Sequence, residues 1–297
     1  WEWKNLINTS FVLLLPLSVF IFNNLNLTQH VFRKWLTYVL PLFFLFIPFF
    51  NRADAIGHYF MPVTFFSLLF YLVPKKWKII FFMCTILVII FGQTARSNLI
   101  KFIFSLFFGF LIYFDFFRNK KILNSIRLTF LILPIVLFYL GIIGTFNIFK
   151  VSEYINEDYN FKDSYSPKNE QQSLTNDTRT FLYVEVITSA VVNNYIFLGR
   201  TPARGNDSEY FGEFLAKELK TGKRERFANE VSILNIFTWT GLFGVLLYFV
   251  IFIRASYLAI NKSNNFFMKA IGLYVSFRWM YSWIEDFTRF DFNYLLL

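Results

Sequence analysis

Cysteine and histidine are nearly absent from this chain. Its 297 residues include one cysteine, Cys84, and two histidines, His30 and His58. A single cysteine excludes a disulfide within the chain and a cysteine-rich metal site. The histidines are far apart in the sequence, and the topology predicted below puts them on opposite sides of a membrane. Neither a phosphate-binding P-loop nor a dinucleotide fingerprint is visible, so we expect no metal and no cofactor.

Acidic residues are scarce as well. Asp and Glu number 19 against 29 Lys and Arg, a formal net charge of +10, and charged residues make up 16% of the chain. Hydrophobic residues make up 56%, with 44 Phe, and the mean hydropathy is positive. A soluble domain of this length could not bury so much apolar surface, so the composition predicts a polytopic membrane protein.

Apolar runs recur along the chain at the length needed to cross a bilayer. A spanning helix needs about 20 apolar residues, or fewer where its ends snorkel or neighbours bury it. We predict an all-α fold with about eight transmembrane helices and one large external, partly helical segment. Several runs are short enough that one pair could form a re-entrant hairpin instead. The predicted spans are 6–22, 35–50, 58–73, 79–92, 99–117, 128–149, 231–253 and 266–284.

Basic residues are distributed unequally between successive loops. Short loops rich in Lys and Arg stay in the cytoplasm, and the opposite loops here hold one basic residue each. The long segment 150–230 therefore faces outside, and its acids outnumber its bases. The net positive charge thus belongs to the cytoplasmic rim, where it contacts membrane lipids, and nucleic acid is not an expected partner. The basic loops contain Arg33 and Lys34; Lys75, Lys76 and Lys78; Arg118, Lys120, Lys121 and Arg127; and Arg254 and Lys262.

This topology divides the chain into three parts. Residues 1–149 hold six predicted transmembrane helices, 150–230 form the external, periplasmic segment, and 231–297 hold two more helices and an external tail. The chain opens without Met in the middle of a hydrophobic pattern, so we expect the sequence to be incomplete at its N-terminus.

The external segment is expected to begin as a loop and to continue as two helices. Asp177 or Thr178 is placed to cap an apolar helix of about 19 residues, which lies along the outer membrane interface and ends at Gly199. A second, amphipathic helix is expected from about Ser208 to Leu219.

Four arginines on the external side are the first candidates for function. Arg96 lies in GQTARSNL between two spans, Arg179 opens the interfacial helix, and Arg200 and Arg204 lie in GRTPARG. Guanidinium groups bind phosphate oxygens through two parallel hydrogen bonds and stay charged at every relevant pH. A lipid-linked phosphate or pyrophosphate would suit them. An equal alternative is that they snorkel at the interface or pair with the carboxylates of the segment.

Four further charged residues could take part in chemistry. Glu230 precedes the span in ANEVSILNIF, where it could act as a general base or could simply favour the helix dipole. Arg278 lies within the last predicted span, and Glu285 is seven residues further on. Ionisable residues at membrane depth mark functional sites or paired structural charges, and both interpretations are open here. Glu185, in the interfacial helix, is an additional candidate.

The order of these features resembles the bacterial O-antigen polymerase and O-antigen ligase superfamily of membrane glycosyltransferases. The resemblance covers about residues 85–260. It comprises QTARSN around Arg96, then Arg179 with Tyr183 four residues later, then NNYIFLGR, and finally the two glycines of TGLFG, Gly241 and Gly244. The ligase branch has a catalytic His eleven residues before the first of those glycines, where this chain has Glu230. That difference favours a Wzy-type polymerase over a ligase.

The resemblance implies a function. A GT-C-like enzyme in the bacterial inner membrane would polymerise undecaprenyl-pyrophosphate-linked repeat units on the periplasmic face, without nucleotide or metal. Arg96, Arg179, Arg200 and Arg204 would hold the pyrophosphate, and Glu230 would be the base. A chain-length regulator and a flippase would be partners. A transporter or flippase of the same lipid-linked sugar is the rival class, for which paired midplane charges and two similar halves are typical.

Overall fold

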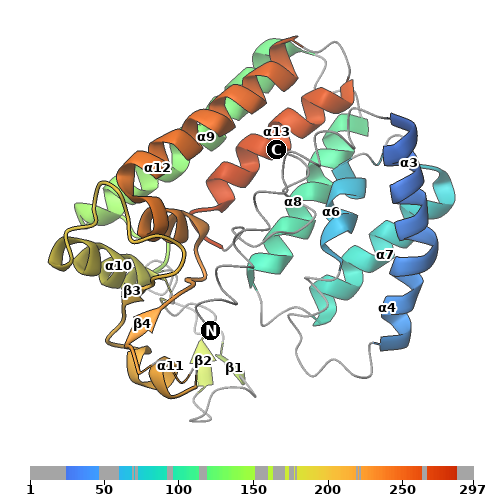
Figure 1. Cartoon of the computed structure of the whole chain (residues 1–297). Helices are drawn as coiled ribbons and strands as arrows, with labels where there is room; N and C mark the ends of the chain where they lie inside the picture. The colour runs from blue at the N-terminus through green and yellow to red at the C-terminus, as the bar shows by residue number, and fades with distance from the viewer. Residues whose placement is uncertain are drawn as a thin grey trace. The chain divides into compact units, whose positions relative to one another are not determined.

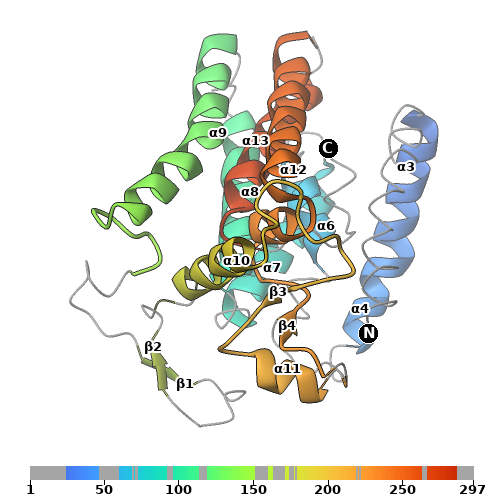
Figure 2. The same ribbon diagram turned by 60° about the vertical axis from the view of Figure 1, so that its left-hand side comes forward.

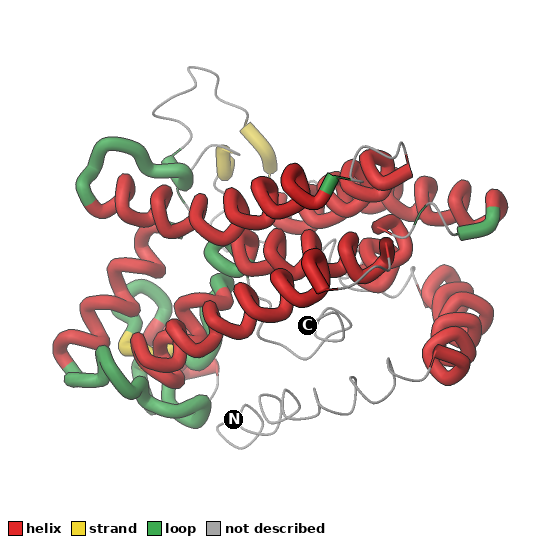
Figure 3. The backbone as a smooth tube through the Cα atoms, turned by 90° about the horizontal axis from the view of Figure 1, so that it is seen from above, coloured by secondary structure: helices red, strands yellow, loops and turns green. Residues whose placement is uncertain are grey.

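The computed structural model describes residues 25–46, 60–68, 70, 73–91, 96–113, 119–150, 160–162, 171–173, 177, 179–218, 220, 222–262 and 266–285. These residues are mostly helical, with two short two-stranded sheets, as Figure 3 shows by colour. The all-α expectation is therefore confirmed for the described part of the chain. The chain divides into two compact units. One is built from described residues of 128–253 and 277–285, and the other from those of 25–127 and 254–276.

The second of these units is a set of helices labelled in Figure 1. Aromatic rings hold parts of it together, such as Phe66 and Phe81, whose centroids are 5.2 Å apart. A side chain at Gly109 would overlap the carbonyl of Ser67, so a glycine is needed where α8 crosses the end of α6. The helices are α3 (Leu25–Lys34), η2 (Trp35–Val39), α4 (Leu40–Phe46), α6 (Met61–Leu68), α7 (Lys75–Phe91), α8 (Arg96–Tyr113) and η5 (Leu258–Lys262), with the first turns of α9 (Lys120–Ile142) and α13 (Phe266–Tyr281).

Two described helices are long and apolar enough to span a membrane. They are α9 and the helical stretch Ser232–Lys262, which comprises α12 (Ser232–Tyr257), with a kink at Gly241, and η5. Most of each helix is exposed, and the exposed side chains include Ile132, Val136, Leu246 and Val250. A core helix of a soluble protein would bury such residues, so these exposed apolar surfaces favour a lipid environment.

Several predicted spans differ from the observed helices in their bounds. The predicted span 6–22 lies outside the described residues. Span 58–73 contains the eight-residue α6, which is too short to cross a bilayer as a helix. Span 128–149 begins earlier than expected, because α9 starts at Lys120 and takes up the basic residues assigned to a loop. The side chain of Asn119 accepts the N–H of Lys121 at 2.9 Å and caps this earlier start.

The described residues of the segment 150–230 form two strand pairs and two helices. Strands β1 (Asn160–Lys162) and β2 (Gln171–Ser173) pair antiparallel in the part expected to be loop. Strands β3 (Asn206–Asp207) and β4 (Glu225–Arg226) also pair antiparallel, beside α11 (Gly212–Glu218), as Figures 1 and 2 show. Helix α11 begins four residues later than predicted. Ser208 instead accepts the N–H of Phe211 in a turn that precedes the helix.

Helix α10 (Thr180–Val192) is the predicted interfacial helix, but it is shorter than expected. As predicted, Asp177 caps its start, because its Oδ1 accepts the N–H groups of Arg179 and Thr180 at 3.1 and 2.9 Å. The helix ends at Val192 rather than at Gly199. Asn194 adopts a left-handed conformation with φ of 56°, and the N–H of Tyr195 bonds the carbonyl of Ala190. This is the Schellman arrangement that usually takes glycine and less often asparagine.

The segment after α10 crosses α12 backbone against backbone. Helix α12 is interrupted at Gly241, where φ is 65° and ψ is −168°. The N–H of Arg200 bonds the carbonyl of Thr238 at 2.7 Å, and the N–H of Leu242 bonds the carbonyl of Ile196 at 2.7 Å. A side chain at Gly199 would overlap the backbone of Trp239, and one at Gly241 would overlap the backbone of Phe197. Both glycines are therefore required by this close crossing.

Aromatic packing and polar links join α9, α12 and the end of α13 in the first unit. Trp279 of α13 is 1% exposed, donates its ring N–H to the carbonyl of Leu131 in α9, and stacks on Phe249 of α12 at 4.5 Å. At the other end, the backbone N–H and the hydroxyl of Ser232 both bond the carbonyl of Glu285 at 2.9 Å. The start of α12 is thereby fixed to the turn that follows α13.

Candidate active site

Arg179 and Glu230 form an ion pair at the start of the long apolar helix α12. The Nη1 atom of Arg179 lies 2.5 Å from Oε2 of Glu230, and Arg179 also donates from Nε to the carbonyl of Ile284 at 3.3 Å. Glu230 comes two residues before the first residue of α12. The structure thus brings together two of the residues selected from the sequence, one as a phosphate ligand and the other as a base.

Arg226 is a second cation at the same carboxylate, and the sequence analysis missed it. Its Nη2 atom lies 3.7 Å from Oε1 of Glu230, and its guanidinium group lies over the ring of Phe211 at 4.9 Å. The pKa of Arg226 is lowered because it is buried, against the opposing effect of Glu230. Its spacing of four residues from Glu230 was a usable signal, since acid–base pairs at this spacing commonly interact.

The backbone beside Glu230 is held by buried amide side chains. Asn229 and Asn235 bond each other twice: the N–H of Asn229 donates to Asn235 Oδ1 at 2.6 Å, and Asn235 Nδ2 donates to the carbonyl of Asn229 at 2.9 Å. Asn229 Nδ2 also donates to Oδ1 of Asn206 in β3 at 2.9 Å. All three asparagines are buried. Buried amides with definite partners leave little freedom, so Glu230 starts from a well-defined position.

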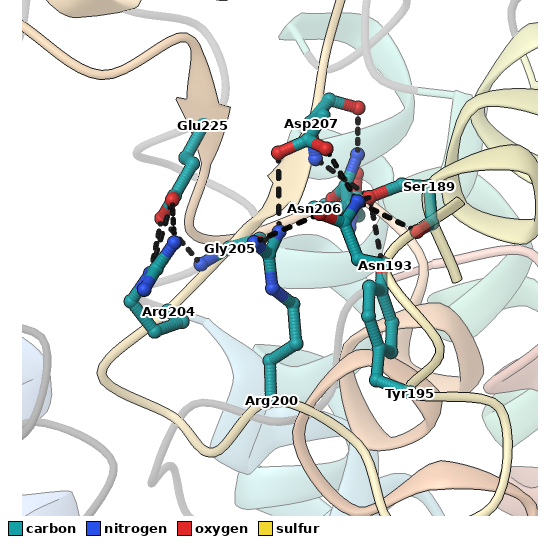
Figure 4. A network of polar contacts seen from close by, with 10 residues as sticks. Ser189, Asn193, Tyr195, Arg200, Arg204, Gly205, Asn206, Asp207 and Glu225 are labelled. Atoms are coloured by element: carbon teal, nitrogen blue, oxygen red, sulfur yellow. Dashed lines mark hydrogen bonds and ion pairs between the residues drawn. The ribbon is translucent and has the colours of Figure 1, made fainter. Parts of the chain in front are cut away.

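Arg200 lies in a polar network that joins α10 to β3 (Figure 4). Its Nη1 donates to the carbonyl of Gly205 at 3.0 Å and to Oδ1 of Asp207 at 3.1 Å, and its guanidinium group lies over the ring of Tyr195 at 5.2 Å. Asn193 donates to the other carboxylate oxygen of Asp207 at 2.6 Å. Arg200 therefore has a carboxylate partner within its own loop.

Arg204 is paired with Glu225 across the β3–β4 strands, as Figure 4 also shows. Its Nε bonds both carboxylate oxygens of Glu225, at 3.0 and 3.1 Å, and its Nη2 bonds Oε1 at 2.5 Å. The Glu225 side chain is 6% exposed and that of Arg204 is 44% exposed. The pairing of loop arginines with loop carboxylates was the alternative to phosphate binding, and Arg200 and Arg204 both show such pairing.

The additional candidates lie elsewhere in the fold. Both oxygens of Glu185 accept hydrogen bonds, from the hydroxyl of Ser208 and the N–H of Tyr210, each at 2.9 Å. Arg278 and Glu285 are both buried, but α13 ends at Tyr281 rather than at 284 as predicted, so Glu285 lies beyond the helix. The reason is a turn at 282–284, in which the N–H groups of Ile284 and Glu285 both bond the carbonyl of Tyr281.

Arg96 is the first residue of α8, in the other unit, and its side chain lies outside the described residues.

An open pocket of about 650 Å³ lies beside the β3–β4 strands and α11. Its lining mixes both signs of charge and includes the exposed ion pair of Glu213 and Arg224. Within the described residues, no group of three or more His, Cys, Asp or Glu side chains is arranged to hold a metal ion. The pocket is lined by Asp207, Ser208, Glu209, Glu213, Lys223, Arg224 and Glu225.

Chemically, the strongest feature is the pair of guanidinium groups at a carboxylate that directly precedes the long apolar helix α12. Arginines fixed in this way can bind a phosphate or a carboxylate, and a carboxylate beside a bound anion can accept a proton. Comparison with family models, with curated proteins and with solved structures found no match.

Proposed function

We propose that the protein is a membrane glycosyltransferase that polymerises oligosaccharide repeat units carried on undecaprenyl pyrophosphate. The observation that supports this most is the cluster of Arg179, Arg226 and Glu230 directly before the long apolar helix α12. A substrate with a lipid tail and a diphosphate head would place its phosphates at such a position, where the hydrophobic part of the protein meets its polar segment. The sequence motifs resembling the O-antigen polymerases add to this argument.

The reaction we propose needs a nucleophile, a leaving group and a place for one proton. A hydroxyl oxygen of the acceptor sugar attacks the anomeric carbon of the donor glycan and forms the new glycosidic bond. The bond from that carbon to the pyrophosphate oxygen breaks, and its electron pair leaves with undecaprenyl pyrophosphate. Glu230 accepts the hydroxyl proton. Arg179 and Arg226 stabilise the leaving group, whose negative charge grows in the transition state.

The location of the enzyme in this proposal is the bacterial inner membrane, with the segment 150–230 on the periplasmic side. The polymerase would cross the membrane about eight times in the given sequence. Its partners would be lipid-linked glycans, a flippase that supplies them and a chain-length regulator. Arg96, Arg200 and Arg204 would line the path of the glycan or its pyrophosphate.

Two other functions compete with this one. An O-antigen ligase would transfer the finished chain to a lipid core, but Glu230 stands where that branch has its His. A flippase or transporter would carry the lipid-linked sugar across the membrane. The charged cluster argues against transport, because it lies in one asymmetric segment before α12 rather than in two similar halves.

Deletion of the gene, followed by electrophoresis of the cell-surface polysaccharide, separates these functions. A polymerase defect leaves chains of a single repeat unit, and plasmid-borne wild-type protein restores the long chains. A ligase defect leaves long chains that are not attached to the lipid core. A flippase defect leaves lipid-linked repeat units on the cytoplasmic side. Polysaccharide of normal length and attachment would overturn the proposal.

A further inference from the structure

We infer that Glu230 is a built-in competitor for the phosphate of the substrate, so that binding of the diphosphate to Arg179 and Arg226 releases the carboxylate. The inference rests on the proposed function for the identity of the ligand. It assigns Arg226 to the anion site and gives Glu230 a role before the chemical step. The argument comes from the burial, the hydrogen bonds and the charges of these three residues.

The two cations are more deeply buried than the anion between them. The side chains of Arg179 and Arg226 are 20% and 11% exposed, whereas that of Glu230 is 59% exposed. An anion arriving from solvent therefore meets Glu230 first and finds the guanidinium groups behind it. Displacing an exposed carboxylate costs little, because water solvates it as soon as it moves away.

Glu230 leaves part of the hydrogen-bonding capacity of Arg226 unused. Arg226 donates from Nε to the carbonyl of Ala228 at 3.3 Å, but its Nη2 is 3.7 Å from Glu230, which is too far for a hydrogen bond. Its Nη1 is buried and has no hydrogen-bond partner among the described residues. A buried N–H without a partner is costly, so a tetrahedral anion that reached both arginines would be better bound than one carboxylate.

The charges around the cluster change when Glu230 moves away. Two guanidinium groups face Glu230, and the other carboxylate whose charge acts on Arg226 is Glu185. Both oxygens of Glu185 accept hydrogen bonds, from Ser208 and Tyr210. When Glu230 leaves, its single negative charge is lost from the two arginines, and a diphosphate replaces it with more than one negative charge.

This arrangement orders the steps of the proposed reaction. While Glu230 is paired with Arg179, its Oε2 atom is occupied by the guanidinium group and does not face an acceptor hydroxyl. Once the diphosphate holds both arginines, Glu230 is free beside the leaving group and can act as the base. The donor would thus activate the enzyme for attack by the acceptor, and premature proton transfer would be avoided.

The test is the affinity of the purified full chain in nanodiscs for inorganic pyrophosphate, measured by calorimetry at one fixed, low ionic strength. Glu230→Gln removes the competing charge from an exposed position, so we expect it to bind pyrophosphate about threefold more tightly than the wild type. Arg226→Lys keeps a charge but loses the forked donor, so its binding should weaken about tenfold. Equal or weaker binding by Glu230→Gln would overturn the inference.

A matched control comes from the exposed pair of Arg224 and Glu213, whose side chains are 70% and 66% exposed. Glu213→Gln also frees an arginine, but one outside the cluster, and should leave the pyrophosphate affinity unchanged. An equal gain in this variant would show a general charge effect and would contradict the inference.

Two further measurements separate the inference from the proposed function. Farnesyl pyrophosphate is the second probe: stronger binding than inorganic pyrophosphate, with the same gain in Glu230→Gln, indicates a lipid-linked ligand. Equal binding of both probes, with the gain, keeps the inference and points to a free phosphate compound. If Glu230→Gln shows the gain but the gene deletion leaves the polysaccharide unchanged, the anion site stands and the polymerase proposal fails.

Discussion

Arg179 and Glu230 are 51 positions apart in the sequence, and their ion pair joins the start of α10 to the residues that precede α12. The same arginine bonds the carbonyl of Ile284, so three separate segments meet at one guanidinium group. The position of the Arg179 side chain therefore depends on contacts with distant parts of the chain rather than on α10 alone. A side chain held from three directions is well suited to bind a phosphate group in a fixed orientation.

Arg179→Ala should abolish long polysaccharide chains at normal protein levels, and Arg179→Lys should restore little. Lysine keeps the charge but cannot form the forked contact with two oxygens at once. The measurement is electrophoresis of surface polysaccharide from a deletion strain that carries each variant. Arg33→Ala, on the predicted cytoplasmic side, is the control. Normal chain lengths with Arg179→Ala would contradict the assigned role.

Substitution of Gly199 or Gly241, at the backbone crossing, should lower the free energy of unfolding more than substitution of a glycine of the same conformation elsewhere. Gly144 also has a positive φ, 74°, but a side chain there would meet nothing within 4 Å. Gly144→Ala should cost about 1 to 2 kcal/mol of unfolding free energy, from the backbone conformation alone. Gly199→Ala and Gly241→Ala add an overlap with backbone atoms and should cost at least about 2 kcal/mol more.

Thermal unfolding in detergent compares these three variants directly. If Gly199→Ala is as stable as Gly144→Ala, the close crossing does not exist in solution.

The pair of Arg204 and Glu225 should contribute to stability more than the exposed pair of Arg224 and Glu213. Arg204→Ala leaves a carboxylate that is 6% exposed without its cation. Breaking a fully buried pair costs about 3 to 5 kcal/mol, and because Arg204 itself is partly exposed we expect about 2 to 3 kcal/mol. Arg224→Ala should cost less than about 1 kcal/mol.

A double-mutant cycle with Glu225→Gln isolates the interaction energy of that buried pair. If Arg204→Ala leaves the stability unchanged but shortens the polysaccharide, Arg204 serves substrate binding rather than the fold.

Asp177 should stabilise the protein in a pH-dependent way. Burial raises the pKa of its carboxyl. Hydrogen bonds from the hydroxyl and N–H of Thr180 and the N–H of Arg179, with the charge of Lys150, lower that pKa by more, so the net shift is downward from 3.8. A carboxyl with a lowered folded-state pKa contributes stability above its ordinary pKa and loses it as the pH falls through the folded value.

Asp177→Asn keeps the capping oxygen and removes the charge. It should be less stable than the wild type by about 0.5 kcal/mol at pH 6. Unfolding curves at pH 6, 4 and 3 should show this difference shrinking as the pH falls. A difference that stays constant over this range would contradict the assigned role of the charge.

The membrane orientation can be tested with single cysteines in a Cys84→Ser background. Lys120→Cys, at the start of α9, should resist an impermeant thiol reagent in intact cells, because the basic loops are predicted to be cytoplasmic. Glu209→Cys, in the segment before α11, should be labelled. Permeabilised cells provide the control, in which both positions should react. Labelling of Lys120→Cys in intact cells would reverse the predicted orientation.

Local sequence signals predicted the helical composition and part of the site. Asp177 was identified as a cap because it precedes an apolar run, and Arg179 and Glu230 were selected for their charge and position. The end of α10 was predicted at Gly199, but Asn194 already takes a left-handed conformation and ends the helix earlier. Asparagine adopts this conformation at a low cost, so composition alone does not reveal which of the two residues ends the helix.

The partners of the arginines depend on distant parts of the chain, which residue patterns do not locate. Arg204 meets Glu225 only because β3 pairs with β4, and the register of two-residue strands cannot be read from alternation. The selection of Arg179 and Glu230 did not predict that they would neutralise each other. Arg226 was overlooked because it stands in a run of charged residues, and its burial follows from the packing of Phe211.

The crossing of Gly199 over Gly241 has a consequence for how this sequence can diverge. Each glycine is needed because the backbone of the other segment lies against it, so a change at either position is tolerated only if the opposite segment moves as well. Insertions between Ile196 and Thr201 would break the hydrogen bonds to 238–243 and should be rare among descendants of this chain. A chimera that exchanges the arginine-bearing loop must therefore also exchange the helical segment around Gly241.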